Sequence, residues 1–182
     1  MQDIDILRYP IGKFAPAQTY TFEQTEKAIE QIAHLPKKLT DLVGKWGDER
    51  LDTPYRPDGW TVRMLVHHIT DSHINAYVRT KLALTEDNPT IKPYKEGEWA
   101  KLPDSLLSIA PSLVILSNLH LRWATILESL SEKDLQRTYH HPENGREFSL
   151  HQVIALYAWH GEHHYQHIYQ LATRNNWLEH VV

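Results

Sequence analysis

The sequence predicts an all-α protein, a four-helix bundle, and three observations support this. Four long stretches repeat apolar residues three and four positions apart, the spacing of an amphipathic helix. No alternation of strand and helix patterns is present, so a parallel sheet is not expected. The chain has 182 residues and 41% hydrophobic content, which suits one domain over residues 1–182 with a single core.

A first helix is expected from Thr21 to about Trp46. Thr21 and Gln24 have the spacing of a capping box, which starts a helix. The apolar residues that follow fall roughly on one face, at Ile29, Ile32, Leu35, Leu39 and Val43. Pro36 lies inside this stretch and has no backbone N–H, so we expect a kink or a break near His34.

A second helix is expected from Thr61, its N-cap, to about Leu84, because its apolar residues again recur every three or four positions. Residues 85–111 then hold several prolines, a glycine and many charges. Loops of this length are uncommon unless they cover a site or carry short helices. We therefore expect a long surface connection between the second and third helices.

A third helix is expected over about residues 113–130. Residues 138–148 contain a proline and an Asn-Gly pair, which predict a turn or a small hairpin. The fourth helix begins at Ser149, with Gln152 as its capping-box partner, and continues to about Asn175.

Composition excludes several classes of function. A net charge of −4 and a pI near 6.3 argue against a nucleic-acid partner. The absence of cysteine excludes disulfides, thiolate metal ligands, a cysteine nucleophile and iron–sulfur clusters. No window approaches the roughly 18 apolar residues of a membrane helix, and the first ten residues lack the apolar core of a signal peptide. We expect a cytoplasmic protein with no membrane partner.

The histidines are the most informative residues. There are thirteen, and four of them fall within residues 160–167. His160 and His164 are four positions apart on a helix, so both can point at one metal ion, and His163 and His167 form a second such pair. A third ligand must come from another helix.

The second helix carries a polar stripe of His68, Asp71, Ser72 and Asn75 between apolar neighbours. Metal sites in helical bundles are built on such faces. The alternative is that a His-x-x-x-His pair is surface decoration or a hydrogen-bonded core pair. We expect the other histidines to be scattered surface or packing residues: His34, His73, His120, His140, His141, His151 and His180.

Two other metal motifs fit less well. The zincin helix needs a glutamate directly after its first histidine, where this chain has Gly161. A di-iron bundle needs Glu-x-x-His units, and Glu162 is followed at that spacing by Tyr165. A dinuclear carboxylate site is therefore not expected.

At the level of whole motifs, the chain resembles the DinB/YfiT-like superfamily, and especially its YfiT subgroup. The strongest match is Tyr-Arg-Pro-Asp-Gly-Trp-Thr-Val-Arg at 55–63, followed by Val-His-His-Ile-Thr-Asp-Ser-His at 66–73. Further matching pieces lie at residues 8–12, 91–94, 120–123, 139–142 and 157–160 with His164. The resemblance covers nearly the whole chain.

This resemblance implies an up-and-down-type four-helix bundle, often a homodimer, with one Zn²⁺ or Ni²⁺ ion per chain. Carried over to this sequence, the three ligands are His68, His160 and His164. The chain departs from the family pattern at Gly161-Glu162, where relatives tend to have Ser-His. That departure leaves the three ligands intact and changes their surroundings.

Three neutral histidines leave a coordination position open, which is typical of catalytic metal sites. Activated water would support a metal-dependent hydrolase, and a bound thiolate would support the bacillithiol-type thiol S-transferase that the resemblance also implies. The substrate would be a small molecule, for transfer a low-molecular-weight thiol. The alternative is a non-enzymatic metal-binding or stress-response bundle.

Four charged residues are candidates for supporting roles. Asp71 and Glu162 are the carboxylates nearest to the histidines in sequence, and either could orient an imidazole or act as a base. The alternative is that they keep the helices soluble. Arg63 and Arg122 could pair with an anionic substrate, or they are ordinary surface or bridging charges.

Overall fold

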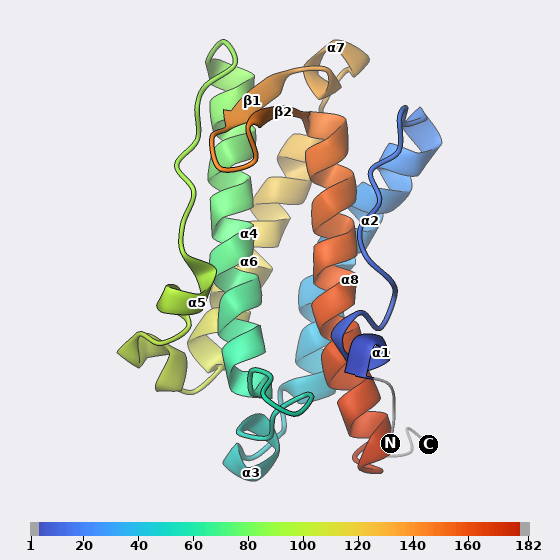
Figure 1. Ribbon diagram of the computed structural model, residues 1–182. Coiled ribbons are helices and arrows are strands. Elements are labelled where there is room, and N and C mark those ends of the chain that lie inside the picture. The colour runs from blue at the N-terminus through green and yellow to red at the C-terminus, as the bar shows by residue number, and fades with distance from the viewer. Residues whose placement is uncertain (1–3, 179–182) are drawn as a thin grey trace.

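The computed structural model describes residues 4–178, so His180 lies outside the described residues. Four long helices form a bundle, as predicted (Figure 1): α2 (Phe22–Val43), α4 (Val62–Thr85), α6 (Ala110–Glu128) and α8 (Leu150–Arg174). The shorter elements are α1 (Ile4–Arg8), α3 (Asp48–Leu51), α5 (Glu96–Trp99), the 3₁₀-helix η1 (Pro103–Leu106), α7 (Glu132–Leu135), β1 (Thr138–His141) and β2 (Arg146–Ser149). Within this part of the chain, no helix is long and apolar enough to cross a membrane.

The order of the helices differs from the expected up-and-down arrangement. Helices α2 and α4 each pack mainly against α6 and α8, so α2 and α4 lie on a diagonal of the bundle. In Figure 1, α4 and α6 run in one direction while α2 and α8 run in the other. The up-and-down expectation is wrong because residues 86–109 return along the full length of α4, roughly 36 Å, before α6 begins.

This return segment carries short helices, as predicted, in the form of α5 and η1. Its first part is joined to the antiparallel β1–β2 hairpin, which confirms the small hairpin as the structure of residues 138–149. The backbone N–H of Ile91 donates to the carbonyl of His140 at 3.0 Å, and the N–H of His140 donates to Pro89 at 2.9 Å. The segment is thereby fixed beside α4.

Pro36 does not break α2, which is continuous from Phe22 to Val43, so the expectation of a break is wrong. A proline removes the hydrogen bond to the carbonyl four residues earlier, which here belongs to Ile32. Helix α6 supplies the missing donor, because His120 Nδ1 lies 2.6 Å from that oxygen. Tertiary contact thus satisfies the carbonyl that the proline leaves free.

The core has two apolar clusters separated by a polar layer. One cluster contains Ala76 and Trp123, and the other contains Ile69 and Leu116. Along α4, His73 lies between Ile69 and Ala76, and on α6 a second histidine lies between Leu116 and Trp123. Both histidines are completely buried, so imidazole side chains interrupt the hydrophobic interior at mid-bundle.

Candidate metal centre

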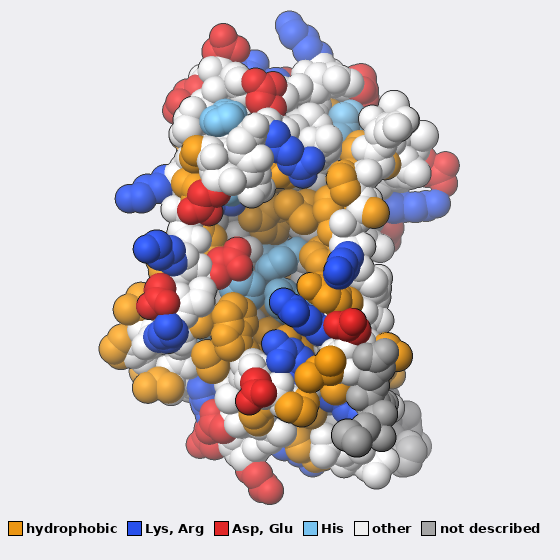
Figure 2. Space-filling view, in the orientation of Figure 1, with side chains coloured by type: hydrophobic (Ala, Val, Ile, Leu, Met, Phe, Trp, Pro, Cys, Tyr) orange, Lys and Arg blue, Asp and Glu red, His pale blue; other side chains and the backbone are white. Residues whose placement is uncertain are grey.

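The three histidines expected to bind metal come together where α4 packs against α8. His68 lies on α4, and His160 and His164 lie one turn apart on α8. One ring nitrogen from each lies within 4.8 Å of the others, and the Nε2 atoms of His68 and His160 are 3.3 Å apart. Figure 2 shows histidine side chains at the floor of a hollow on this face.

These distances suit a single small divalent ion. Two nitrogens bound to one zinc-like ion at about 2.0–2.1 Å and the tetrahedral angle lie about 3.3 Å apart. Burial lowers the pKa of His68 to about 4 and holds the pKa values of His160 and His164 well below the ordinary range. The imidazoles are therefore neutral near pH 7, as metal ligands must be, and the residues present fit the ion.

A chain of hydrogen bonds runs from His160 into the core. His160 Nδ1 lies 3.2 Å from His73 Nε2, and His73 Nδ1 lies 2.9 Å from His120 Nε2. The chain ends at the Ile32 carbonyl that Pro36 leaves free. The sequence predicts His73 and His120 to be scattered surface or packing residues, and the structure instead connects them to the candidate ligand His160.

The direction of these bonds fixes the tautomer of each ring. Burial lowers the pKa values of His73 and His120, so both rings are neutral and each carries one N–H. A carbonyl only accepts, so His120 carries its proton on Nδ1 and accepts from His73 at Nε2. By the same argument His73 accepts from His160 Nδ1–H. The Nε2 atom of His160 therefore presents its lone pair to His68 and the metal position.

A shorter chain supports His164 in the same way. The backbone carbonyl of Arg8 lies 3.1 Å from His167 Nε2, and His167 Nδ1 lies 3.3 Å from His164 Nδ1. His167 must donate to the carbonyl, so it accepts from His164 Nδ1–H and leaves His164 Nε2 free for an ion. With His163, the last two histidines also lie close enough to form a second ligand group. Hydrogen bonds occupy both ring nitrogens of His167, which favours a supporting role for His167 rather than a second metal site.

Asp71 lies one helical turn beyond His68 on α4, as the sequence suggested. Its side chain is half-buried, and its carboxylate makes no hydrogen bond or ion pair with the described residues. Burial and the nearby charge of Asp104 raise the pKa of Asp71 to about 6. A carboxylate in this state can accept a proton near neutral pH.

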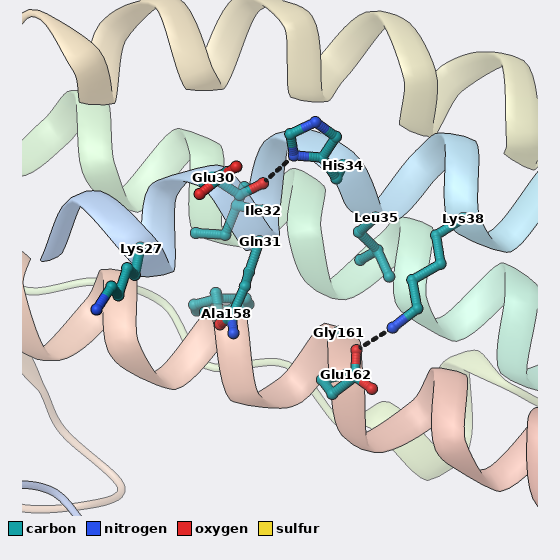
Figure 3. A pocket seen from close by; sticks show the side chains of 11 residues that line it. Lys27, Glu30, Gln31, Ile32, His34, Leu35, Lys38, Ala158, Gly161 and Glu162 are labelled. Atoms are coloured by element: carbon teal, nitrogen blue, oxygen red, sulfur yellow. Dashed lines mark hydrogen bonds and ion pairs between the residues drawn. The ribbon is translucent and has the colours of Figure 1, made fainter. Parts of the chain in front are cut away.

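The structure does not bring Glu162 into the histidine cluster. Its two carboxylate oxygens accept hydrogen bonds from Lys38 at 2.6 Å and from Gln166 at 2.8 Å. Figure 3 shows the contact between Glu162 and Lys38 of α2, and both residues line a cavity of about 350 Å³ between α2 and α8. The sequence placed Glu162 near the ligands along the chain, but the helix turns its side chain toward α2.

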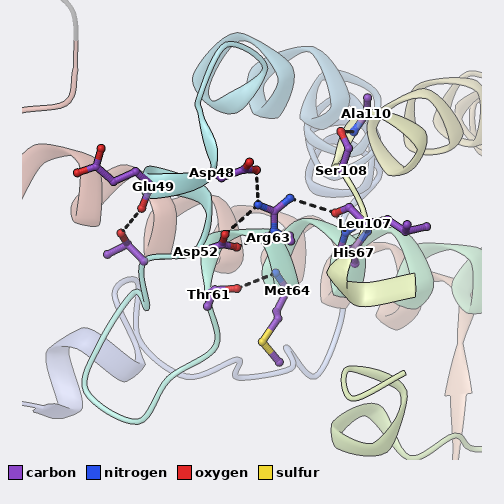
Figure 4. A network of polar contacts seen from close by, with 11 residues as sticks. Asp48, Glu49, Asp52, Thr61, Arg63, Met64, His67, Leu107, Ser108 and Ala110 are labelled. Atoms are coloured by element: carbon purple, nitrogen blue, oxygen red, sulfur yellow. Dashed lines mark hydrogen bonds and ion pairs between the residues drawn. The ribbon is translucent and has the colours of Figure 1, made fainter. Parts of the chain in front are cut away.

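The two arginines considered as anion-binding residues have structural roles. Arg63 is buried and donates to both Asp48 and Asp52 at 2.6 Å, and to the Leu107 carbonyl at 3.1 Å (Figure 4). It joins α4 to the α3 segment and to the end of the return segment. Arg122 is exposed on α6, with its guanidinium 5.6 Å from the ring centre of a tyrosine. The bridging and surface interpretations fit both residues.

Two cavities reach the cluster from different sides. One, of about 280 Å³, is lined by His160 and by residues of α4, the return segment and the hairpin. The other, of about 350 Å³, is lined by His164 together with Arg8 and Arg56. The candidate ligands on α8 are therefore accessible to small molecules.

Comparisons with known proteins found similar sequences and a similar fold. A family model described as the DinB superfamily matches residues 31–168. Proteins of Bacillus mycoides (strain KBAB4) and Bacillus cereus (strain 03BB102), both named "Putative metal-dependent hydrolase", are each 54% identical over 94% of this chain and 98% of their own length. The solved structure of YfiT from Bacillus subtilis is described as a probable metal-dependent hydrolase with an unusual four-helix bundle topology. It is 42% identical, has a TM-score of 0.91, and the match covers 94% of this chain and 99% of that one.

Proposed function

Since the chain belongs to the DinB superfamily, we propose that it is a divalent-metal-dependent hydrolase whose ion is held by His68, His160 and His164. The observation that supports this most strongly is the convergence of three neutral imidazoles, two with a fixed tautomer, beside a cavity. Such an ion, when bound, supplies a Lewis acid that polarises a substrate oxygen and lowers the pKa of water. Imidazole ligands suit Zn²⁺ and Ni²⁺, as they also suit copper and iron, and we propose Zn²⁺ or Ni²⁺ as the ion.

The chain's own residues would orient the metal ligands and accept a proton. The hydrogen bonds through His73 and His167 hold the rings of His160 and His164 in one orientation, which reduces the reorganisation needed on binding. Asp71 would accept a proton from the attacking water. In the complete reaction, the oxygen of water joins one product and the proton passes to the leaving group.

The test is an activity screen on the zinc- and nickel-loaded protein with small ester, amide and phosphoester substrates, with and without a low-molecular-weight thiol. The proposal expects metal-dependent hydrolysis without thiol, lost in His164→Ala and reduced by Asp71→Asn. Product formed only by transfer of the thiol would contradict it and indicate an S-transferase. A bound ion with no turnover would favour the non-enzymatic alternative.

A further inference from the structure

Arg79 on α4 is a buried cation that lacks a carboxylate partner. The residue is 8% exposed, and its guanidinium makes one long hydrogen bond, at 3.4 Å, to the carbonyl of Lys92. The phenols of Tyr139 and Tyr157 also lie close enough for Arg79 to lower their pKa values, but neither phenol carries a compensating charge. No carboxylate between residues 4 and 178 forms an ion pair with it. Arg63, equally buried, has two aspartate partners. Because an unpaired buried charge is costly, Arg79 is expected to have a partner that is not part of the protein.

Arg79 lines the cavity of about 280 Å³ that also reaches His160. Two further polar atoms in this cavity lack partners, the buried hydroxyl of Tyr94 and Nδ1 of His141. Ser72 lies close enough to Tyr94 to influence its pKa, but no well-formed hydrogen bond joins them. Three groups from α4, the return segment and β1 therefore face one space with hydrogen-bonding capacity unused.

The cation acts on the groups around it. After burial, Arg79 is the largest cause that lowers the pKa of His141, and it opposes the effect of burial on the Tyr157 phenol. Glu96 also lines the cavity, and burial raises the pKa of its carboxyl despite the nearby arginine. Glu96 is thus the protein group best placed to compete for Arg79, although it does not form an ion pair with it.

We propose that Arg79 binds an oxyanion group of the substrate, a carboxylate or a phosphate, while the reacting bond lies toward His160. The planar guanidinium fork matches both groups, and the Tyr94 hydroxyl adds a donor. Arg79 and His68 are eleven positions apart on α4, a rise of roughly 16 Å between their backbones. The Arg79 side chain shortens this distance by several Å, because helical side chains tilt toward the N-terminus. The substrate class is therefore an elongated organic anion, charged at the end away from the cleaved bond. The reacting end depends on the proposed function, whereas anion binding by Arg79 does not.

The test is calorimetric titration of the full chain, stripped of metal, with glutarate and inorganic phosphate as anionic probes and glutaramide as a neutral analogue. We expect glutarate or phosphate to bind, glutaramide not to bind, and Arg79→Gln to raise the dissociation constant roughly tenfold or more. Arg122→Gln, which removes an exposed arginine on α6, is the matched control and should change nothing. Glu96→Gln should strengthen binding, because it removes a competing carboxylate.

Tyr94→Phe keeps the inference testable if Arg79→Gln does not fold, since it removes one unpartnered hydroxyl and should weaken the same anion severalfold. The inference is overturned if folded Arg79→Gln binds as the wild type does, if glutaramide binds as tightly as glutarate, or if neither anion binds. Metal content is measured in parallel. Anion binding without any metal site would overturn the proposed function alone, and a metal site without anion binding would overturn this inference alone.

Discussion

The Nδ1 atom of His120 lies 2.6 Å from the carbonyl oxygen of Ile32, the oxygen that Pro36 leaves without a helical donor. This contact decides which nitrogen of His120 carries the proton. Through His73, the same choice is passed to His160 and determines the nitrogen that faces the candidate ion. A proline on one helix thereby influences ligand chemistry on another helix.

Substitution of His120 tests this chain of hydrogen bonds. His120→Ala removes the acceptor for His73 Nδ1–H, so His73 no longer holds His160 in one tautomer. Outer partners of metal ligands typically contribute 10- to 100-fold in affinity, and we expect Zn²⁺ affinity to fall by roughly that factor. Competition titration with a chelator measures it, and ¹⁵N chemical shifts of the imidazoles report the tautomer.

The control for this experiment is His151→Ala. His151 lies on α8 and is buried like His120. It bonds to Thr25 and Glu132 and takes no part in the chain of hydrogen bonds that ends at His160. Equal loss of Zn²⁺ affinity in both variants would show that the effect is one of general stability.

Stability of the metal-free protein should depend steeply on pH. Burial lowers the pKa of His120 from 6.5 to about 4, and that of His163 to about 4. Above pH 6.5 these histidines are neutral in both the folded and the unfolded protein, and the folded state keeps its full stability. As the pH falls from 6.5 toward 4, the unfolded state binds protons that the folded state cannot, so the free energy of unfolding decreases. Urea denaturation at a series of pH values measures this.

His120→Gln should make the pH dependence shallower, because one buried titrating group is lost. His34→Gln, which changes a histidine outside the buried cluster, should leave the slope as in the wild type. A free energy of unfolding that stays constant between pH 7 and 4.5 would contradict the burial of neutral histidines.

Glu162→Gln tests the position of that carboxylate. Glu162 pairs with Lys38, and both side chains are about one third exposed or more, at 32% and 40%. Because such pairs contribute little, the free energy of unfolding should change by less than about 1 kcal/mol, with metal content and turnover unchanged. Asp71→Asn should instead reduce turnover by about 100-fold while the ion stays bound. Equal losses of turnover in the two variants would indicate that Glu162 acts in the reaction and would contradict its position outside the site.

Gly161→Ala tests the close approach of α2 and α8. A Cβ atom at Gly161 would lie 2.5 Å from Leu35 Cδ2 and 3.5 Å from His73 Cε1. Overpacking at such a site costs roughly 1–3 kcal/mol, and thermal unfolding should show it. Gly97→Ala, where nothing lies within 4 Å, is the control. An unchanged melting temperature for Gly161→Ala would mean that α2 and α8 can accommodate the added methyl group, which would contradict their close approach at this point.

Much of the fold could be predicted because its signals are local. The capping boxes at Thr21 and Ser149 and the N-cap at Thr61 are all present, and they start the helices where the sequence places them. The up-and-down prediction for the direction of the helices is wrong, because residues 86–109 are long enough either to turn back at once or to return along α4. No local pattern distinguishes these two paths.

Only part of the candidate site could be predicted from the sequence. His160 and His164 share one helix, so their proximity follows from helical spacing alone. The roles of His73 and His120 depend on which helices become neighbours, and nothing local to either residue indicates this. The one available signal was Pro36, which predicts a free carbonyl but not the side chain that reaches it.

Metal binding by His160 tests the central proposal most directly. We predict that tag-free wild-type protein, stripped and then titrated with Zn²⁺ and Ni²⁺, binds about one ion per chain, as three imidazole ligands with an open position allow. Elemental analysis and calorimetry should show that His160→Ala binds little or none, while His151→Ala binds as the wild type does. Undiminished binding in His160→Ala would contradict the proposed metal centre.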